Sequence, residues 1–315
     1  MRPDLSIIIP SRSPQFLQQT IDDFLKHSES NIEIIVVMDG IWCDPPIKND
    51  PRVIIIHHGT VHESWGMRES INRGIAISRG KYILKTDEHV SVSQGYDKIL
   101  MADCADDEVI IPSRGRLDVD KWEKIHDGRS NIDYMYIEFP FLKPFDPTQG
   151  LHGAEWRERG QQRKNILIDE TPTMQGSFYF MSRKHWDTTI KELNTKKYGP
   201  FTMEAQEISM ATWLSGGRVL VNKKVEYLHW HKGIKGKGYN FSTQQYEVFM
   251  EQKEKGRQYA IDYWLVTKDF KYDFEWFISK FWPIPKWSEN WKEKIEQDRK
   301  KDFRYSPEFK TWKGG

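Results

Sequence analysis

The amino-terminal part of the chain alternates short aliphatic segments with amphipathic ones. The aliphatic segments are LSIII at 5–9, EIIVVM at 33–38, VIII at 53–56, YILKT at 82–86 and EVIIP at 108–112. Segments that are apolar on both faces and separated by helices are typical of a mainly parallel sheet that is covered on both sides. The intervening segments show helical spacing, as at Leu17, Ile21 and Phe24, with further helices predicted at about 65–78 and 95–103. This alternation predicts an α/β fold.

The rest of the chain divides into a mixed part and a helical part. A loop-rich segment at 113–165 precedes a strand at 177–181, a helix at about 203–214 that ends at Gly216-Gly217, and two strands at 218–221 and 225–229. From 239 onward the pattern is helical and aromatic. We therefore expect one half-domain at 1–115, a second at 116–238 and a helical, basic extension at 239–315.

Composition excludes several classes of protein. The 315 residues are 38% hydrophobic and 30% charged, which is ordinary for a soluble globular protein. With only Cys43 and Cys104, a disulfide scaffold and a multi-cysteine zinc module are excluded. A net charge of +1 does not favour a globally basic nucleic-acid-binding protein. The sequence shows no transmembrane segment and no signal peptide, so a cytoplasmic location is expected.

Polar residues follow several of the predicted strands directly. Ligands of parallel sheets bind at the carboxyl ends of the strands, which points to Pro10-Ser11-Arg12, Asp39-Gly40 and Asp87-Glu88-His89. Asp87 and His89 are two residues apart, so in an extended segment their side chains project to the same side. A carboxylate and an imidazole suit Mn²⁺ or a similar divalent ion. His229 or His231, near the end of a later strand, is able to complete such a site.

Two further segments carry candidate chemistry. The sequence KGIKGKG at 232–238 is either a basic loop that closes over a diphosphate or a solvated surface loop. Glu204 and Glu207 lie three residues apart and so on one face of the predicted helix. They are candidate general bases, or acidic residues placed favourably in the first helical turn.

Five segments, in this order, resemble family 2-type glycosyltransferases of the GT-A fold. They are LSIIIPSR at 5–12, IIVVMDG at 34–40, INRGIAISRGKYILKTDEHV at 71–90, MQGSFYFMSRKHW at 174–186 and MEAQEISMATWLSGGRVLV at 203–221. The resemblance covers roughly 5–232. The D-x-H pattern at 87–89 is also similar to that of the polypeptide N-acetylgalactosaminyltransferases. The resemblance implies a UDP-sugar donor, Mn²⁺ or Mg²⁺ as cofactor, a nucleotide-sugar-binding half at 1–115 and an acceptor half at 116–238.

The resemblance also implies roles for the matching residues. Pro10, Ser11 and Arg12 would hold the nucleotide, Asp39 would bind the uracil edge, and Arg73 would lie near the diphosphate or ribose. Asp87 would contact ribose and metal, His89 would bind the metal, and His229 would be the third ligand, with His231 in reserve. Gln175 and Gly176 would border the donor sugar.

One departure concerns the catalytic base. Inverting relatives carry an adjacent Glu-Asp pair whose Asp is the base, whereas here the second position is Ala205. The base is then Glu204, or the enzyme retains the anomeric configuration without that base.

The acceptor is predicted largely from the resemblance. Short relatives of this kind occur in bacteria and bacteriophages, and some phage-type enzymes glycosylate 5-hydroxymethylpyrimidines in DNA. In the carboxyl-terminal part, aromatic and basic side chains suit either DNA or packing on the domain. They are Trp282, Trp287, Trp291, Lys286, Lys292, Lys294, Arg299, Lys300, Lys301 and Arg304. We predict 5-hydroxymethylcytosine or a related hydroxymethylpyrimidine in DNA as acceptor, with a glycan, protein or lipid-linked acceptor as the alternative.

Two other classes of function remain open at this point. A nucleotidyltransferase also uses a parallel sheet and acidic metal ligands, but usually has a glycine-rich loop after its first strand. PSRSP at 10–14 contains no glycine. A non-catalytic nucleotide-sugar-binding module would bind the donor without metal-dependent turnover.

Overall fold

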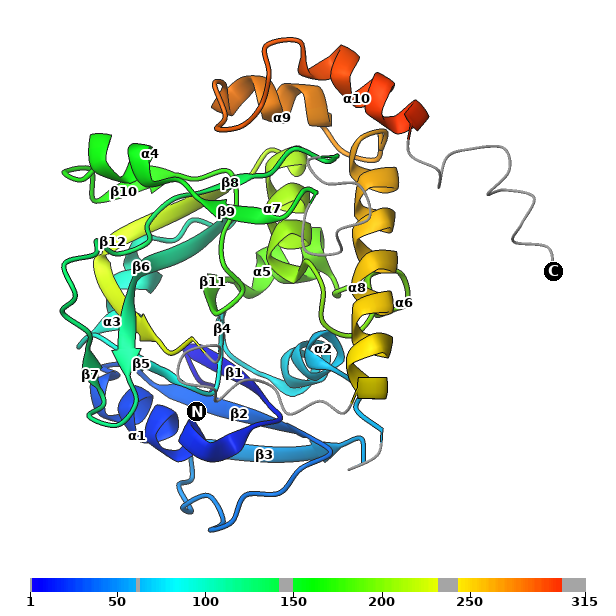
Figure 1. The fold of residues 1–315 in the computed structure, drawn as a ribbon. Coiled ribbons are helices and arrows are strands. Elements are labelled where there is room, and N and C mark those ends of the chain that lie inside the picture. Colours follow the sequence, from blue (N-terminus) through cyan, green and yellow to red (C-terminus); the bar gives the residue numbers. More distant parts are fainter. Residues whose placement is uncertain (1, 61–62, 142–149, 232–242, 302–315) are drawn as a thin grey trace.

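The computed structural model describes residues 2–60, 63–141, 150–231 and 243–301. The strands are β1 (Leu5–Ser11), β2 (Ile32–Asp39), β3 (Val53–His58), β4 (Tyr82–Thr86), β5 (Val90–Val92), β6 (Glu108–Asp118), β7 (Glu123–Lys124), β8 (Met135–Ile137), β9 (Gly153–Glu155), β10 (Ile168–Glu170), β11 (Phe178–Ser182) and β12 (Arg218–His229). The main sheet has the order β10-β12-β6-β11-β4-β1-β2-β3, with β5 beside β12 and β7 beside β6 (Figure 1). β8 and β9 form a separate hairpin-like pair.

The predicted mainly parallel sheet is confirmed, with one antiparallel strand inside it. β4, β1, β2 and β3 run parallel, and β12 runs parallel to β6. β11 is antiparallel to both of its neighbours, β4 and β6. Because β6 extends over 108–118, the expected boundary between 115 and 116 falls inside a strand. The two half-domains thus share one sheet.

The prediction of two strands at 218–221 and 225–229 was wrong. They form the single strand β12, whose pairing with β6 shifts register between Asn222 and Glu226. The polar residues that suggested a turn lie at this bulge, where the Asn222 side chain accepts a hydrogen bond from the backbone N–H of Lys224 at 3.0 Å. A bulge bends a strand without ending its pairing.

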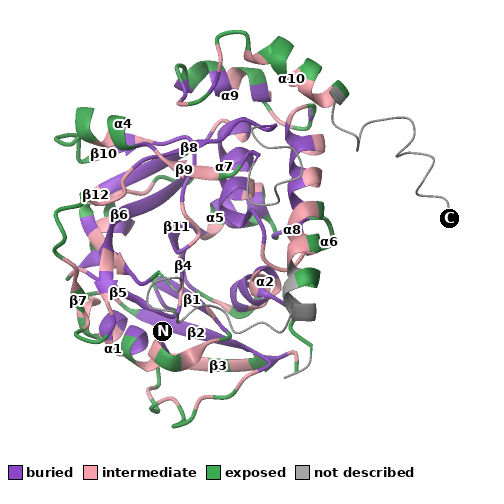
Figure 2. Ribbon diagram, in the orientation of Figure 1, coloured by how far each residue is buried: buried purple, intermediate pink, exposed green. Residues whose placement is uncertain are grey.

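Helices cover both faces of the sheet. They are α1 (Leu17–His27), α2 (Met67–Ile77), α3 (Tyr96–Asp103) and α7 (Glu204–Ser215), with the short helices α4 (Arg157–Gln162), α5 (Arg183–His185) and α6 (Thr195–Tyr198). On one face Phe24 of α1 contacts Tyr96 of α3 and Phe178 of β11. On the other, α2 approaches β1 so closely that a Cβ on Gly74 would lie 2.5 Å from Ile8 Cγ2. The residues of β1, β2 and β11 are accordingly almost all buried (Figure 2).

The carboxyl-terminal part contains α8 (Thr243–Trp264), α9 (Phe274–Phe281) and α10 (Trp291–Lys301). Several of its aromatic side chains pack on the rest of the molecule. The indole N–H of Trp264 donates to the Tyr198 hydroxyl at 2.6 Å, and that of Trp287 donates to the Ile137 carbonyl at 2.9 Å. Among the helices that the structure describes, none combines the length and the apolar character that crossing a bilayer requires.

His185 in α5 makes stability depend on pH. The ring is 2% exposed, and its Nε2 lies 2.9 Å from Thr212 Oγ1. Burial lowers the pKa of His185 to about 4 from the usual 6.5. As pH falls below 6.5 the unfolded chain takes up the proton first, so the contribution of His185 to stability is complete above pH 6.5 and falls progressively toward pH 4. The difference corresponds to about 3 kcal/mol.

We expect the variant His185→Gln to lose less stability than the wild-type protein between pH 7.5 and pH 4.5, measured by urea unfolding. His126→Gln, a substitution of an exposed histidine, is the matched control and should keep the wild-type pH dependence. Identical pH dependence in wild type and His185→Gln would contradict the prediction.

Candidate functional site

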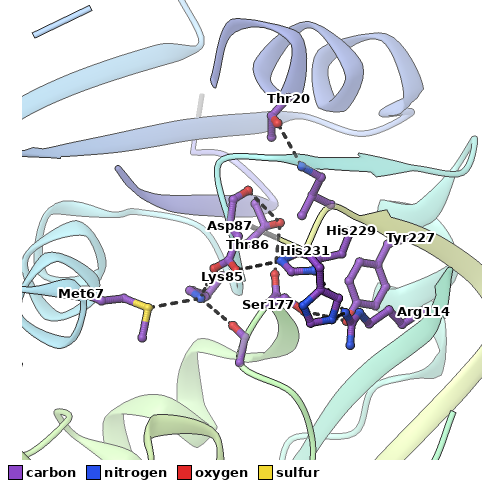
Figure 3. Close-up of polar contacts among 12 residues, drawn as sticks. Thr20, Met67, Lys85, Thr86, Asp87, Arg114, Ser177, Tyr227, His229 and His231 are labelled. Atoms are coloured by element: carbon purple, nitrogen blue, oxygen red, sulfur yellow. Dashed lines mark hydrogen bonds and ion pairs between the residues drawn. The ribbon is translucent and has the colours of Figure 1, made fainter. Parts of the chain in front are cut away.

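Asp87, His89 and His229 come together at one edge of the sheet. One potential ligand atom from each lies within 4.8 Å of the other two. The Nε2 atom of His229 is 3.2 Å from Asp87 Oδ2 (Figure 3). The rings of His89 and His229 have centroids 4.9 Å apart. One carboxylate oxygen and two imidazole nitrogens are a donor set that fits a divalent transition-metal ion.

The local backbone differs from the extended segment that the sequence suggested. Residues 87–89 form a bend between β4 and β5, so strand alternation does not explain why Asp87 and His89 converge. Instead the bend leads into β5, which pairs antiparallel with β12 and places Val90 opposite His229. The backbone N–H of Trp230 donates to the His89 carbonyl at 3.2 Å. This pairing joins parts of the chain that are far apart in sequence.

A buried lysine adjoins the group. Lys85 of β4 donates to Asp87 Oδ1 at 2.7 Å and to the Gly176 carbonyl at 2.5 Å. Burial alone would raise the pKa of the Asp87 carboxyl, but the ammonium of Lys85, with His229, holds it well below its usual value. Burial lowers the pKa of His229 more than Asp87 raises it, so its ring is neutral at pH 7, as metal ligation requires.

Arg114 of β6 lies on the other side of His229. Its Nη2 atom is 3.3 Å from His229 Nδ1 and also contacts His231 Nε2. The His231 ring therefore faces the guanidinium, and burial beside Arg114 lowers the pKa of His231 to about 4. Of the two histidines that the sequence left open, His229 is the one grouped with Asp87 and His89.

The two candidate bases on α7 have different surroundings. Glu204 is 3% exposed, and its Oε1 atom lies 3.3 Å from Lys85 Nζ. Burial raises the pKa of Glu204 despite Lys85. Glu207 instead pairs with the guanidinium of Arg68 on α2, which is completely buried, and accepts a hydrogen bond from the backbone of Asn194 at 3.3 Å. Glu204 thus adjoins the Asp87 group, whereas Glu207 joins α7 to α2.

The turn after β1 is tied to the same bend. The Ser11 hydroxyl donates to Glu88, and the backbone N–H of Ser13 donates to Glu88 Oε1 at 3.0 Å. Pro10 is half-buried, and Arg12 is exposed and donates to the Asp39 carbonyl at 2.7 Å. The structure therefore brings the ends of β1, β2 and β4 together, as the sequence predicted for a parallel sheet.

Asp39 is held by backbone and side-chain donors. Its carboxylate accepts from Trp65 N–H at 2.9 Å, from Gly66 N–H at 2.8 Å and from the Ser64 hydroxyl, and the residue is 3% exposed. These contacts fix the entry into α2. Arg73, one turn after Glu69 on α2, pairs with Glu69 at 3.0 Å and stacks over Trp65 at 4.0 Å from the ring centroid.

The turn before β11 reaches the site from another direction. Gly176 lies so close to α7 that a Cβ there would be 2.8 Å from Glu204 Oε1, and Gln175 beside it is half-buried. The basic loop predicted at 232–238, like Arg304, lies outside the described residues. Closure of that loop stays a prediction.

Sequence reasoning missed Lys85 and Arg114. Lys85 is the single charge in YILKT, a strand segment otherwise apolar up to Thr86, and a lone charge in a central buried strand was a signal that it has a specific partner. Arg114 lies within SRGR at 113–116, which was assigned to a loop-rich segment. Nothing local indicated that it continues β6 and faces His229.

Comparisons with known proteins agree with this arrangement. Residues 6–188 match the protein family described as Glycosyl transferase family 2. The uncharacterized glycosyltransferase EpsJ of Bacillus subtilis (strain 168) is 34% identical over 100 residues, which cover 29% of this chain and 28% of EpsJ. Glycosyltransferase GlyG of Streptococcus pneumoniae serotype 4 (strain ATCC BAA-334 / TIGR4) is 30% identical over 90 residues, covering 26% of this chain and 29% of GlyG. The matches thus span less than a third of either relative.

A solved structure extends the comparison to nearly the whole fold. The crystal structure of GalNAc-T7 with UDP, GalNAc and Mn²⁺ superposes with a TM-score of 0.63 and 13% sequence identity, covering 89% of this chain and 56% of that one. At this identity the likeness shows the fold. The GT-A fold expected from the sequence is therefore confirmed.

The different surroundings of Glu204 and Glu207 predict different effects on stability. We expect Glu207→Gln to lower the free energy of unfolding by about 3 kcal/mol, because it leaves the buried Arg68 without its carboxylate partner. Glu204→Gln should cost clearly less, because Lys85 keeps Asp87 and the Gly176 carbonyl as partners. Chemical denaturation of both variants checks this, and equal losses would refute the distinction.

Proposed function

Because the chain belongs to glycosyl transferase family 2, we propose that it is a metal-dependent glycosyltransferase that moves a sugar from a UDP-sugar to an acceptor hydroxyl. The observation that carries the proposal is the convergence of Asp87, His89 and His229 at the carboxyl edge of the sheet. The names of the two curated relatives support the reaction class, and the UDP and Mn²⁺ in the GalNAc-T7 structure support the choice of donor and ion.

Asp87, His89 and His229 would hold the ion, which is Mn²⁺ or Mg²⁺. Their donor atoms fit such an ion because they are one carboxylate oxygen and two nitrogens within 4.8 Å of one another. A divalent ion bound there offsets the negative charge of the leaving diphosphate. The two imidazoles make Mn²⁺ the better fit, because Mg²⁺ prefers an all-oxygen shell.

The remaining residues of the site would bind and orient the substrates. In the reaction the bond between the anomeric carbon and the diphosphate oxygen breaks, a bond to the acceptor oxygen forms, and the acceptor hydroxyl loses its proton. Glu204 is our candidate for accepting a hydrogen bond or the proton from a sugar hydroxyl, since it lies beside Gly176 and Lys85. Gln175 and Gly176 would border the donor sugar.

On the nucleotide side we propose Pro10, Ser11, Arg12, Asp39 and Arg73. Arg12 and Arg73 are the charged side chains of this set that reach solvent, so they are suited to the diphosphate or ribose. Asp39 would have to give up contacts with Ser64, Trp65 or Gly66 in order to bind uracil through its carboxylate.

The proposal predicts metal-dependent UDP release. With UDP-glucose, UDP-galactose and their N-acetyl forms as donors, Mn²⁺ should stimulate release, and His89→Ala or His229→Ala should abolish the stimulation. His126→Ala, an exposed histidine, is the matched control and should behave as wild type. Absence of stimulation with every donor would refute the proposal.

Tight UDP-sugar binding without turnover would favour a binding module, and pyrophosphate release from UTP with a sugar phosphate would favour a nucleotidyltransferase.

The acceptor, 5-hydroxymethylcytosine in DNA, stays a prediction. Trp287 is buried and engaged with the Ile137 carbonyl, and Trp291 packs edge-on against it with ring centroids 5.7 Å apart. These two rings therefore pack within the protein. The features that still favour a DNA acceptor are Trp282, which is 38% exposed, and the basic side chains of α10.

The DNA acceptor is tested by incubating hydroxymethylcytosine-containing DNA and unmodified DNA with donor and Mn²⁺. Mass spectrometry of the digested nucleosides should show a hexose or N-acetylhexosamine added to hydroxymethylcytosine alone. An unchanged profile, together with UDP release in the presence of a glycan or protein acceptor, would replace DNA with that acceptor.

A further inference from the structure

Lys85 is an unusual residue for its position. It is the next-to-last residue of β4 and lies between two neighbouring strands, with Ile8 of β1 and Tyr179 of β11 opposite it, and it is completely buried. Its side chain points to the face covered by α2, where Met67 Sδ lies 3.9 Å from the ammonium (Figure 3). A charge at such a place is strongly unfavourable unless its surroundings compensate for it.

Compensation comes from three different segments. The ammonium donates to Asp87 Oδ1 in the bend after β4 and to the Gly176 carbonyl in the turn before β11. It also forms an ion pair with Glu204 at the start of α7. The Lys85 ammonium thus connects Asp87, a candidate metal ligand, to Gly176 and Glu204, which we propose to lie beside the donor sugar.

Lys85 also decides how Asp87 presents its oxygens. Oδ1 is taken by Lys85, whereas Oδ2 faces His229 Nε2 at 3.2 Å. An ion held by Asp87 and His229 would therefore be bound through Oδ2, with Oδ1 remaining on the lysine. The carboxylate would then offer the ion one oxygen, and it shares its charge with Lys85.

The charges around the group nearly cancel. Asp87 and Glu204 are opposed by Lys85 and, next to His229, by Arg114. A cation entering this site meets little net negative charge. A nucleoside diphosphate would supply the missing negative charge from outside the protein.

We infer that Lys85 is a positioning residue that keeps the affinity of the empty site for a divalent ion low, so that the ion and the nucleoside diphosphate bind together. This inference rests on the proposed function. It adds that one residue of the chain sets the coupling between ion and nucleotide. Since a purely structural lysine would loosen the site when removed, the two roles predict changes of opposite sign in ion affinity.

The test measures Mn²⁺ binding from the electron paramagnetic resonance signal of free Mn²⁺, with and without UDP. Without UDP, Lys85→Met should bind Mn²⁺ about tenfold more tightly than wild type, the size expected for removing a like charge near a ligand. UDP should increase the Mn²⁺ affinity of wild type more than that of Lys85→Met. Lys81→Met, which replaces an exposed lysine directly before β4, is the matched control and should leave both affinities unchanged.

A second pair of variants keeps the inference falsifiable if Lys85→Met does not fold. Glu204→Gln should bind Mn²⁺ more weakly than wild type, and Lys85→Met/Glu204→Gln, which removes both members of the ion pair, should bind about tenfold more tightly than Glu204→Gln. Equal or weaker binding after loss of Lys85, in either background, overturns the inference. A wild-type protein that binds no Mn²⁺ even with UDP overturns the proposed function, and the inference with it.

Discussion

The covering of the sheet on both faces is the constraint on which the site depends. With helices on each side, the strands β1, β2 and β4 have little room for polar side chains along their length, and Ile7, Ile8 and Ile9 show the result. Polar groups therefore gather at the carboxyl ends of the strands. Lys85, next to the carboxyl end of β4, is completely buried, and it is tolerated because Asp87 and Glu204 supply opposite charge within the fold.

The site is built from elements that are remote in sequence. Asp87 and His229 are in contact although 142 residues separate them, because β5 and β12 pair beside the bend at 87–89. Glu204 reaches the same place from α7. The structure also distinguishes two glutamates that look equivalent in the sequence. Glu204 forms an ion pair with Lys85, whereas Glu207 forms one with Arg68 on α2. The catalytic role predicted for both glutamates therefore stays a proposal for Glu204 alone, because Glu207 pairs with Arg68 and joins α7 to α2.

Much of the fold was predictable because its signals are local. Runs such as IIVVM at 34–38 are buried on both faces, and α7 ends at Gly216, where the sequence predicted a stop. The bulge in β12 was not predictable, since polar residues at 222–224 look like a turn when the pairing partner is unknown. The D-x-H pattern was identified for a reason that the structure corrected, because the segment bends instead of extending.

The sequence by itself determined the α/β architecture, the residues at the strand ends and the candidate ligands Asp87 and His89, because periodicity and strand termini are properties of neighbouring residues. It left His229 and His231 open as the third ligand, and only the family resemblance favoured His229. Only the tertiary structure decided that Asp39 is held by the start of α2, that Arg114 lies between His229 and His231, and that Lys85 joins two carboxylates. Those are contacts between residues that are far apart in the sequence, and the strength of their electrostatic interactions depends on burial and on distance in space. No local pattern of residue types encodes either quantity.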